Sequence, residues 1–143
     1  MPAKGKYRYM GHTADVMYEA YGQSFEKALE NAALALFEVI ADTRKIRAAK
    51  KVELREKAET LEDLAGFVLS DLNSESDARE IFFKRMKAGK LERTKDGYSI
   101  GFTAEGEPYS VEKGRSHVKA VTKHETQVEE KGGKWRIRIL LDI

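Results

Sequence analysis

The end of the chain alternates apolar and polar residues, which is the pattern of a half-buried β-strand. Within Lys134–Asp142 the apolar positions recur at every second residue: Trp135, Ile137, Ile139 and Leu141. We expect these side chains to face the core. Gly132-Gly133 precedes this run, and Val118–Lys131 precedes the glycines, so the sequence predicts a β-hairpin with a two-residue glycine turn.

The turn length sets which residues face one another across this hairpin. If the two glycines form the whole loop, Lys123 faces Asp142 and His124 faces Leu141. Lys119 and Lys123 then lie on the same face of the sheet as Asp142. A longer loop would shift the register and move these side chains to opposite faces.

Two stretches have the apolar spacing of amphipathic helices. The first spans about Phe25–Ala41 and follows Ser24, a residue type that caps helix N-termini. Its apolar residues recur every three or four positions: Phe25, Ala28, Leu29, Ala32, Leu36 and Ile40. The second helix starts after Thr60, in a Thr-Leu-Glu-Asp motif, and its apolar stripe ends near Asn73.

The remaining segments read as short strands and one loop. The predicted strands are Tyr7–Met10, Val16–Tyr21, Val52–Arg55, Ile81–Met86 and Tyr98–Ala104. Asp96-Gly97 predicts a turn, and Glu105–Ser116 predicts an exposed loop. We therefore expect one α+β domain over residues 1–143, with two amphipathic helices packed on one face of a largely antiparallel sheet of about six or seven strands.

Composition narrows the class of protein. Cysteine is absent, which excludes thiol catalysis, zinc–thiolate sites and disulfides. Charged residues make up 35% of the chain and Asn plus Gln only four positions, a composition typical of thermophiles. The formal net charge is only +2, so bulk charge gives no argument for nucleic-acid binding. Neither a secretory signal nor a membrane span is visible, and we expect a cytoplasmic protein.

The candidate chemistry lies at the two ends of the chain. The stretch GHTADV places His12 and Asp15 three residues apart in a turn, where Asp15 could simply bond turn amides while His12 packs beneath them. Asp142 and the α-carboxylate of Ile143 follow the last apolar run, where a solvated, frayed terminus is the ordinary alternative. If this end lies beside Asp15, three carboxylates meet, and a proton or a cation must relieve their repulsion.

The donor types indicate which metals such a site would bind. Three carboxylates supply oxygen ligands, which suit calcium or magnesium. A nitrogen from His12 would shift the preference toward manganese or zinc.

Basic residues form two clusters. One contains His117, Lys119, Lys123 and His124. The other contains Lys84, Arg85, Lys87, Lys90, Arg93 and Lys95. A solvated surface is the ordinary explanation of both, and phosphate contact is the functional one. Few aromatic residues lie among them, so no stacking platform for single-stranded nucleic acid is evident.

Three blocks together resemble the archease family. They are GHTADV with the following AYGQSFEKALENAALALFEVI, then VKAVTKHETQV, and finally RILLDI. They occur in the family's order and span nearly the whole chain. The resemblance implies a small protein cofactor, not an enzyme. It would assist the GTP-dependent RNA ligase of tRNA splicing by promoting guanylylation of the ligase histidine and multiple turnover, and by broadening its nucleotide choice.

The resemblance also assigns site residues. Asp15, Asp142 and the Ile143 carboxylate fall at the family's acidic metal site, for which calcium is expected, with magnesium or manganese as alternatives. His12 and Lys119 fall at motif positions expected to matter for activation. Lys123 and His124 are further candidates for contact with phosphate or the partner. GTP and RNA would be met through the ligase, and no membrane is involved.

Two departures and two rival functions accompany the resemblance. Lys123 stands where the family often has tyrosine after K-A-V-T, and Ser70-Asp71 precede Leu72-Asn73 where a tryptophan is usual. A general chaperone or modulator of RNA- or DNA-processing proteins would need an exposed apolar groove. A small metal-dependent phosphohydrolase would use the same carboxylates to activate water.

Overall fold

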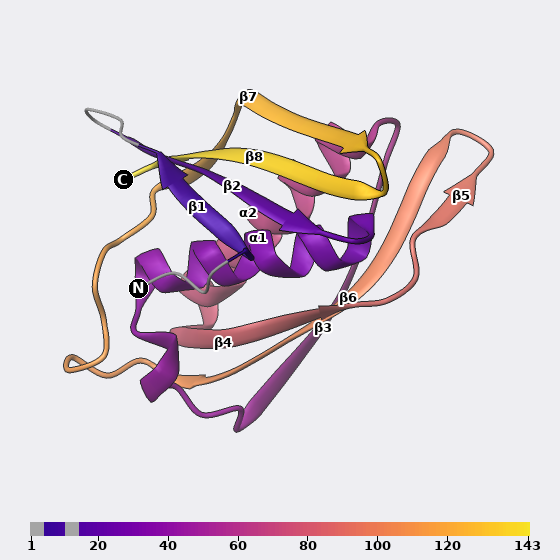
Figure 1. Ribbon diagram of the computed structural model, residues 1–143. Helices are drawn as coiled ribbons and strands as arrows, with labels where there is room; N and C mark the ends of the chain where they lie inside the picture. Colours follow the sequence, from indigo (N-terminus) through magenta and orange to yellow (C-terminus); the bar gives the residue numbers. More distant parts are fainter. Residues whose placement is uncertain (1–4, 11–14) are drawn as a thin grey trace.

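The computed structural model describes residues 5–10 and 15–143, in which eight β-strands and two α-helices form an α+β fold (Figure 1). The strands are β1 (Tyr7–Met10), β2 (Asp15–Gly22), β3 (Lys50–Ala58), β4 (Ile81–Ala88), β5 (Glu92–Thr94), β6 (Gly97–Pro108), β7 (Ala120–Lys131) and β8 (Lys134–Asp142). The helices are α1 (Phe25–Ile40) and α2 (Leu61–Arg79), with a 3₁₀ turn, η1 (Thr43–Lys45). Within these ranges neither helix combines the length and apolar character needed to cross a membrane.

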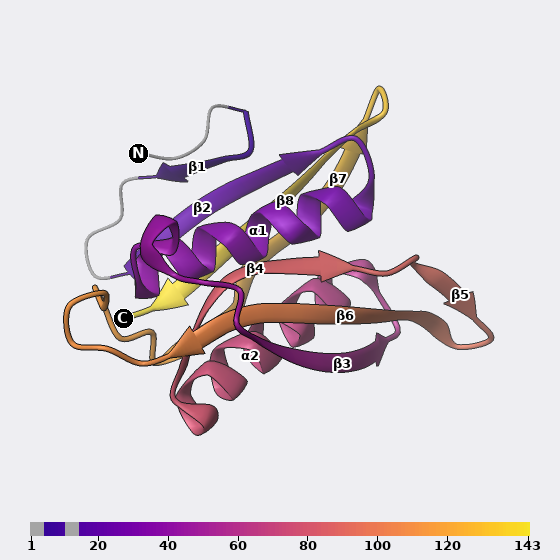
Figure 2. The same ribbon diagram turned by 90° about the horizontal axis from the view of Figure 1, so that it is seen from below.

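The strands form two antiparallel sheets, and the helices lie between them (Figures 1 and 2). One sheet has the order β1-β2-β8-β7; the other has the order β3-β6-β4, with β5 also paired to β6. The predicted α+β class, with two helices and antiparallel strands, is confirmed. The division into two sheets was not foreseen: each helix has one sheet on either side instead of covering one face of a single sheet.

The composition of α1 explains how it fits between two sheets. Ten of its 16 residues are buried, because alanines fill the positions beside the leucine and phenylalanine stripe. A helix that is apolar on most of its circumference must be covered on more than one side. On the β1–β2 side, the Tyr18 hydroxyl donates to the carbonyl of Ala32 over 2.8 Å, and the Tyr9 hydroxyl donates to that of Ala35 over 2.7 Å.

Both helices begin where the sequence predicts. The Ser24 hydroxyl accepts from the Lys27 N–H over 3.0 Å, and the Thr60 hydroxyl accepts from the Asp63 N–H over 3.1 Å. Helix α2 continues to Arg79, beyond the predicted end at Asn73. Its last turns are polar and mostly exposed, so they carry no apolar periodicity that the sequence could reveal.

The predicted loop over Glu105–Ser116 is wrong in its first part, because β6 runs on to Pro108. Glu105 and Glu107 are buried there. Arg85 Nε lies 3.0 Å from Glu105 Oε1, and Lys113 Nζ lies 2.8 Å from Glu107 Oε1. These cations make the burial of two charged residues acceptable. The connection from β6 to β7 therefore spans residues 109–119.

Candidate metal centre

Asp15 and Asp142 lie opposite one another on neighbouring strands, β2 and β8. Alternate residues of β2 face α1, as the Tyr18 hydrogen bond to that helix shows, so Asp15 points to the outer face of the sheet. Directly opposite residues of an antiparallel pair have Cβ atoms about 4.5–5.5 Å apart and share a face. The expected proximity of Asp15 and Asp142 is therefore found.

The strand that carries Asp142 is held on both sides. β8 is flanked by β2 and by β7, where Ala120 lies opposite Asp142. The Lys119 N–H also donates to the Asp142 carbonyl over 2.8 Å. Ile139 and Leu141 are fully buried beneath it. The chain is thus paired through Asp142, the last residue of β8, and Ile143 follows it.

The expected contact between Lys123 and Asp142 is wrong, because β7 contains a register shift. Near the glycine turn the pairing is as predicted, from Lys131 opposite Lys134 to Gln127 opposite Arg138. Beyond the shift Thr122 lies opposite Leu140. Residues 123–126 of β7 therefore span the length of a single residue on β8, and Ala120 takes the place predicted for Lys123.

The bulge has local features of its own. Glu125 adopts a left-handed conformation with φ 62°, and the Thr126 hydroxyl donates to the Thr122 carbonyl over 3.3 Å. Lys123 Nζ lies 5.5 Å from the centre of the Phe67 ring of α2, away from the carboxylate pair. Two other candidates are not placed: His12 lies outside the described residues, as does the side chain of His124.

A second carboxylate on the same face of the sheet, that of Glu19, is buried and bonded to cationic side chains. Glu19 is buried, and its Oε2 accepts from Arg138 Nη2 over 3.0 Å and also from Arg136. The Tyr21 hydroxyl donates to its Oε1 over 3.0 Å. Burial opposes ionisation, but the bonds from Arg138, Tyr21 and Arg136 outweigh it and lower the pKa of Glu19 to about 2. The spacing of these residues gave no sign of this network.

By contrast, no described cationic side chain lies within 4 Å of the Asp15 or Asp142 carboxylate. Like charges directly opposite one another on a sheet are destabilising. The described part of the chain contains no group of three or more His, Cys, Asp or Glu side chains arranged around one point. Asp15 and Asp142 therefore offer two carboxylates on one face of the sheet. An all-oxygen set suits calcium or magnesium.

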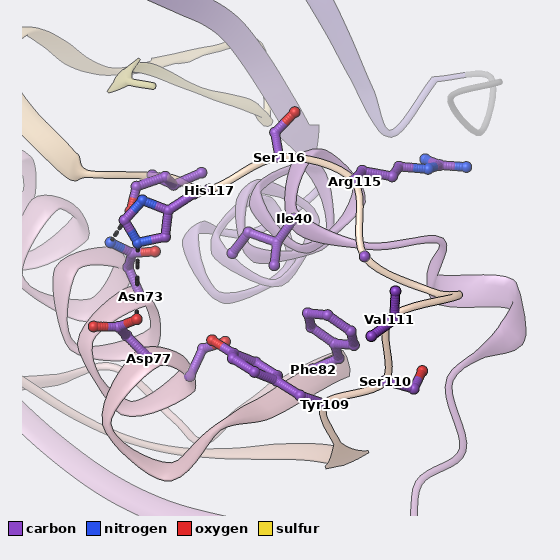
Figure 3. A pocket seen from close by; sticks show the side chains of 13 residues that line it. Ile40, Asn73, Asp77, Phe82, Tyr109, Ser110, Val111, Arg115, Ser116 and His117 are labelled. Carbon is purple, nitrogen blue, oxygen red and sulfur yellow. Dashed lines mark hydrogen bonds and ion pairs between the residues drawn. The ribbon is translucent and has the colours of Figure 1, made fainter.

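A cavity of about 310 Å³ lies beside the 109–119 connection (Figure 3). Its walls are partly apolar, with the Tyr109 ring 4.5 Å from the Phe82 ring, centre to centre. His117 Nε2 lies 3.8 Å from Asp77 Oδ1 at one side. Ser76 also lines the cavity, but its hydroxyl donates to the Ile81 carbonyl over 2.6 Å and is not aligned with His117 as a nucleophile would be. The sequence gave no indication of this cavity.

Comparison with known proteins gives one family. The model of the Archease protein family (MTH1598/TM1083) matches residues 7–143. Protein archease from Methanosarcina mazei is 36% identical over 146 residues, covering 100% of both chains. Protein archease from Aeropyrum pernix is 32% identical over 141 residues, covering 97% of this chain and 98% of the relative.

Two solved structures have the same fold. The solution structure of Methanobacterium thermoautotrophicum protein 1598 has a TM-score of 0.85 and 33% identity, covering 99% of this chain and 100% of that one. The crystal structure of an archease, possible chaperone (TM1083), from Thermotoga maritima has a TM-score of 0.60 and covers 94% of each chain. At 23% identity, the second likeness concerns the fold alone.

Proposed function

The chain belongs to the archease family, and from this membership we propose that it is a protein cofactor that activates the GTP-dependent RNA ligase of tRNA splicing. It would promote guanylylation of the ligase histidine and multiple turnover, and would broaden the ligase's nucleotide choice. It would not itself catalyse a reaction. GTP and RNA would be met through the ligase.

The pairing of Asp15 with Asp142 is the observation that carries this proposal. Two carboxylates at one end of the molecule, with no described cation beside them, attract positive charge from outside the chain. Asp15, Asp142 and the Ile143 α-carboxylate would hold a divalent ion, calcium first, with magnesium or manganese as alternatives. When bound, such an ion supplies positive charge close to a surface that can meet phosphate.

The chain's own residues would position the corner of the molecule that Asp15, Asp142 and Ile143 form. The ladders on both sides of β8 and the buried Ile139 and Leu141 fix the backbone at Asp142. A rigid corner can enter the nucleotide cleft of the ligase and hold its groups in the geometry for in-line attack on the GTP α-phosphate. Catalysis of phosphoryl transfer is largely positioning and charge stabilisation, so a partner that corrects geometry can accelerate it.

Other residues would contact the ligase or phosphate around this corner. Lys119 is exposed and is joined through its backbone to Asp142, so we assign it to partner contact together with His12. Lys123, displaced by the bulge toward α2, and His124 would contact the ligase at most at the edge of this surface.

The test measures guanylylation of purified ligase with labelled GTP, with and without this protein. Asp15→Asn and Asp142→Asn should retain the fold and reduce the stimulated rate at least tenfold. Asp96→Asn is the matched control, because Asp96 lies in the β5–β6 turn at the opposite end of the molecule (Figure 1). Full stimulation by both corner variants would refute the proposal. Hydrolysis of GTP or of a model phosphoester without ligase would instead support a phosphohydrolase.

A chaperone is the second candidate, because the partly apolar cavity beside residues 109–119 could receive a side chain of a client. A general chaperone should suppress aggregation of unrelated proteins, whereas a dedicated activator should affect the ligase alone. Light scattering with two unrelated aggregating clients separates these functions.

A further inference from the structure

The outer face of the β3–β6–β4 sheet has small residues along its centre and long cationic side chains on both sides. Its central strand, β6, presents only small residues near the middle of this face: Ser99, Gly101 and Thr103. The flanking strands present long cationic side chains: Lys51, Arg55 and Lys57 on β3, and Arg85 and Lys87 on β4. Since β3 and β4 both neighbour β6, these two rows stand about 9.5 Å apart.

The result is an open trough with a polar floor and basic walls. A groove of about 530 Å³ lies over Gly101 and Thr103, between Arg55 on one side and Lys87 and Lys90 on the other. The Arg55 guanidinium is fixed by a 2.8 Å hydrogen bond to the Ser99 hydroxyl. A Cβ atom at position 101 would lie 3.2 Å from Arg55 Nη2, so the glycine leaves room for this guanidinium above the floor.

Charge on this face is unbalanced. Around the groove it carries Lys90 in addition to the five cations of β3 and β4, against Glu53, Glu92 and Glu105, while Glu107 at the end of β6 is paired with Lys113. Two of these carboxylates are engaged with arginines, Glu105 with Arg85 at 3.0 Å and Glu92 with Arg55 at 3.5 Å. In the described part of the chain, Lys57, Lys87 and Lys90 have no carboxylate within 4 Å. Their charge is available to an anion.

We propose that this trough binds the sugar–phosphate backbone of RNA. Lysine, arginine, serine and threonine are the groups that contact phosphate and sugar oxygens, and here they line one groove. The large exposed apolar residues of the described chain all lie elsewhere: Tyr109, Val111 and Ile143. A protein-binding surface would have an apolar centre, which this face lacks. Among the described residues, no aromatic side chain projects from this face to stack a base, so binding is independent of sequence.

The choice of RNA over other polyanions rests on the proposed function. The trough lies on the side of the helices away from the sheet that carries Asp15 and Asp142 (Figures 1 and 2). Ligase and RNA could therefore bind this protein at the same time. The activator would hold the RNA substrate near the ligase that it primes.

The experiment measures binding of a fluorescein-labelled, 20-nucleotide single-stranded RNA by fluorescence anisotropy, without ligase, in 50 mM KCl and at rising salt. We expect the wild type to bind this RNA and the trough variant Lys57→Gln/Lys87→Gln/Lys90→Gln to bind it at least tenfold more weakly. In a plot of log affinity against log salt concentration, the slope of the variant should be smaller in magnitude by about 2, because three phosphate contacts are lost. The control Lys6→Gln/Lys131→Gln/Lys134→Gln removes the same charge from another part of the surface and should bind within twofold of wild type.

Three results would overturn the proposal: no binding by the wild type in 50 mM KCl, equal weakening in both triple variants, or unchanged RNA binding by the trough variant. If that variant lost affinity for the ligase in a separate titration, the trough would be a protein-docking surface. This assay contains no ligase and the guanylylation assay contains no RNA, so either proposal can fail while the other stands.

Discussion

The backbone N–H of Lys119 donates to the carbonyl oxygen of Asp142 over 2.8 Å, one step beyond the last residue pair of β7 and β8. This bond ties the end of the chain to the long connection between the two sheets. The Lys119 side chain is exposed, so its amide and its ammonium group have separable roles. The amide holds the backbone at Asp142, and in the proposed function the side chain would contact the ligase.

Substitutions at position 119 separate these roles. Lys119→Ala should weaken stimulation of ligase guanylylation while the melting temperature stays within about 1 °C. Lys119→Pro also removes the N–H, and the lost hydrogen bond costs about 1 kcal/mol, or about 3 °C. Guanylylation kinetics and thermal unfolding measure both effects. Equal kinetics for Lys119→Ala and wild type would contradict the role of the side chain.

The parts of the fold that follow from sequence are those with apolar periodicity. The structure confirms helix α1 and the two-residue turn at Gly132-Gly133 between β7 and β8. It also confirms the burial of Ile137, Ile139 and Leu141. The pairing of Asp15 with Asp142 needed in addition that β2 lie beside β8. The alternation of apolar and polar residues within a strand does not predict which strands are neighbours in the sheet. The only indication that β2 lies beside β8 was that both carboxylates stand next to strand ends.

What the sequence could not reveal depends on contacts between distant segments. Glu105 and Glu107 read as loop residues, yet they are buried because Arg85 and Lys113 meet them from other elements. The bulge at residues 123–126 has no glycine or proline to mark it, and Glu125 adopts its positive φ without one. For that reason the register extrapolated from the turn failed at Lys123.

Asp71 gives a prediction of pH dependence. Burial, followed by the hydrogen bond and charge of Glu56 and the charge of Glu75, raises the pKa of Asp71 to about 7. The folded state then keeps a proton that an unfolded Asp releases near pH 4. Since the unfolded state binds fewer protons between those values, this group lowers stability as the pH rises from about 4 to 7.

Asp71→Asn should remove the loss of stability that Asp71 causes as the pH rises. Relative to wild type, its melting temperature should gain progressively from pH 5 to pH 8, as measured by circular dichroism. Glu56→Gln, which removes the partner, should flatten the profile in the same direction. Parallel profiles for wild type and Asp71→Asn would show that the two carboxyl groups do not share a proton.

Glu19 gives a prediction of the opposite sign. Its pKa, lowered to about 2, means that its stabilisation is present above the unfolded value near pH 4.3 and is lost as the pH falls toward 2. Glu19→Gln leaves Arg136 and Arg138 without their buried carboxylate. We expect a loss of about 2 kcal/mol at pH 7, measured by urea unfolding, that shrinks steadily below pH 4.

Glu129→Gln is the control for Glu19. Glu129 also contacts Arg136, at 2.6 Å, but its side chain is 63% exposed, and exposed pairs contribute little. Its substitution should cost less than about 0.5 kcal/mol. If Glu19→Gln and Glu129→Gln lowered the free energy of unfolding equally, the buried network around Glu19 would contribute no more stability than an exposed ion pair.

The carboxylate pair predicts that calcium inverts the stability order of matched variants. Without metal, Asp15→Asn and Asp142→Asn should melt slightly above wild type, because like charges directly opposite one another are destabilising. A bound ion stabilises only a protein that can hold it, by about 2.7 kcal/mol at a hundredfold excess over the dissociation constant. In millimolar calcium the wild type and Asp96→Asn should therefore melt higher, while both corner variants stay unchanged. A chain extended beyond Ile143 moves the terminal carboxylate and should respond less than wild type. Equal calcium shifts in all of these proteins, measured by differential scanning fluorimetry, would place the cation elsewhere on the surface.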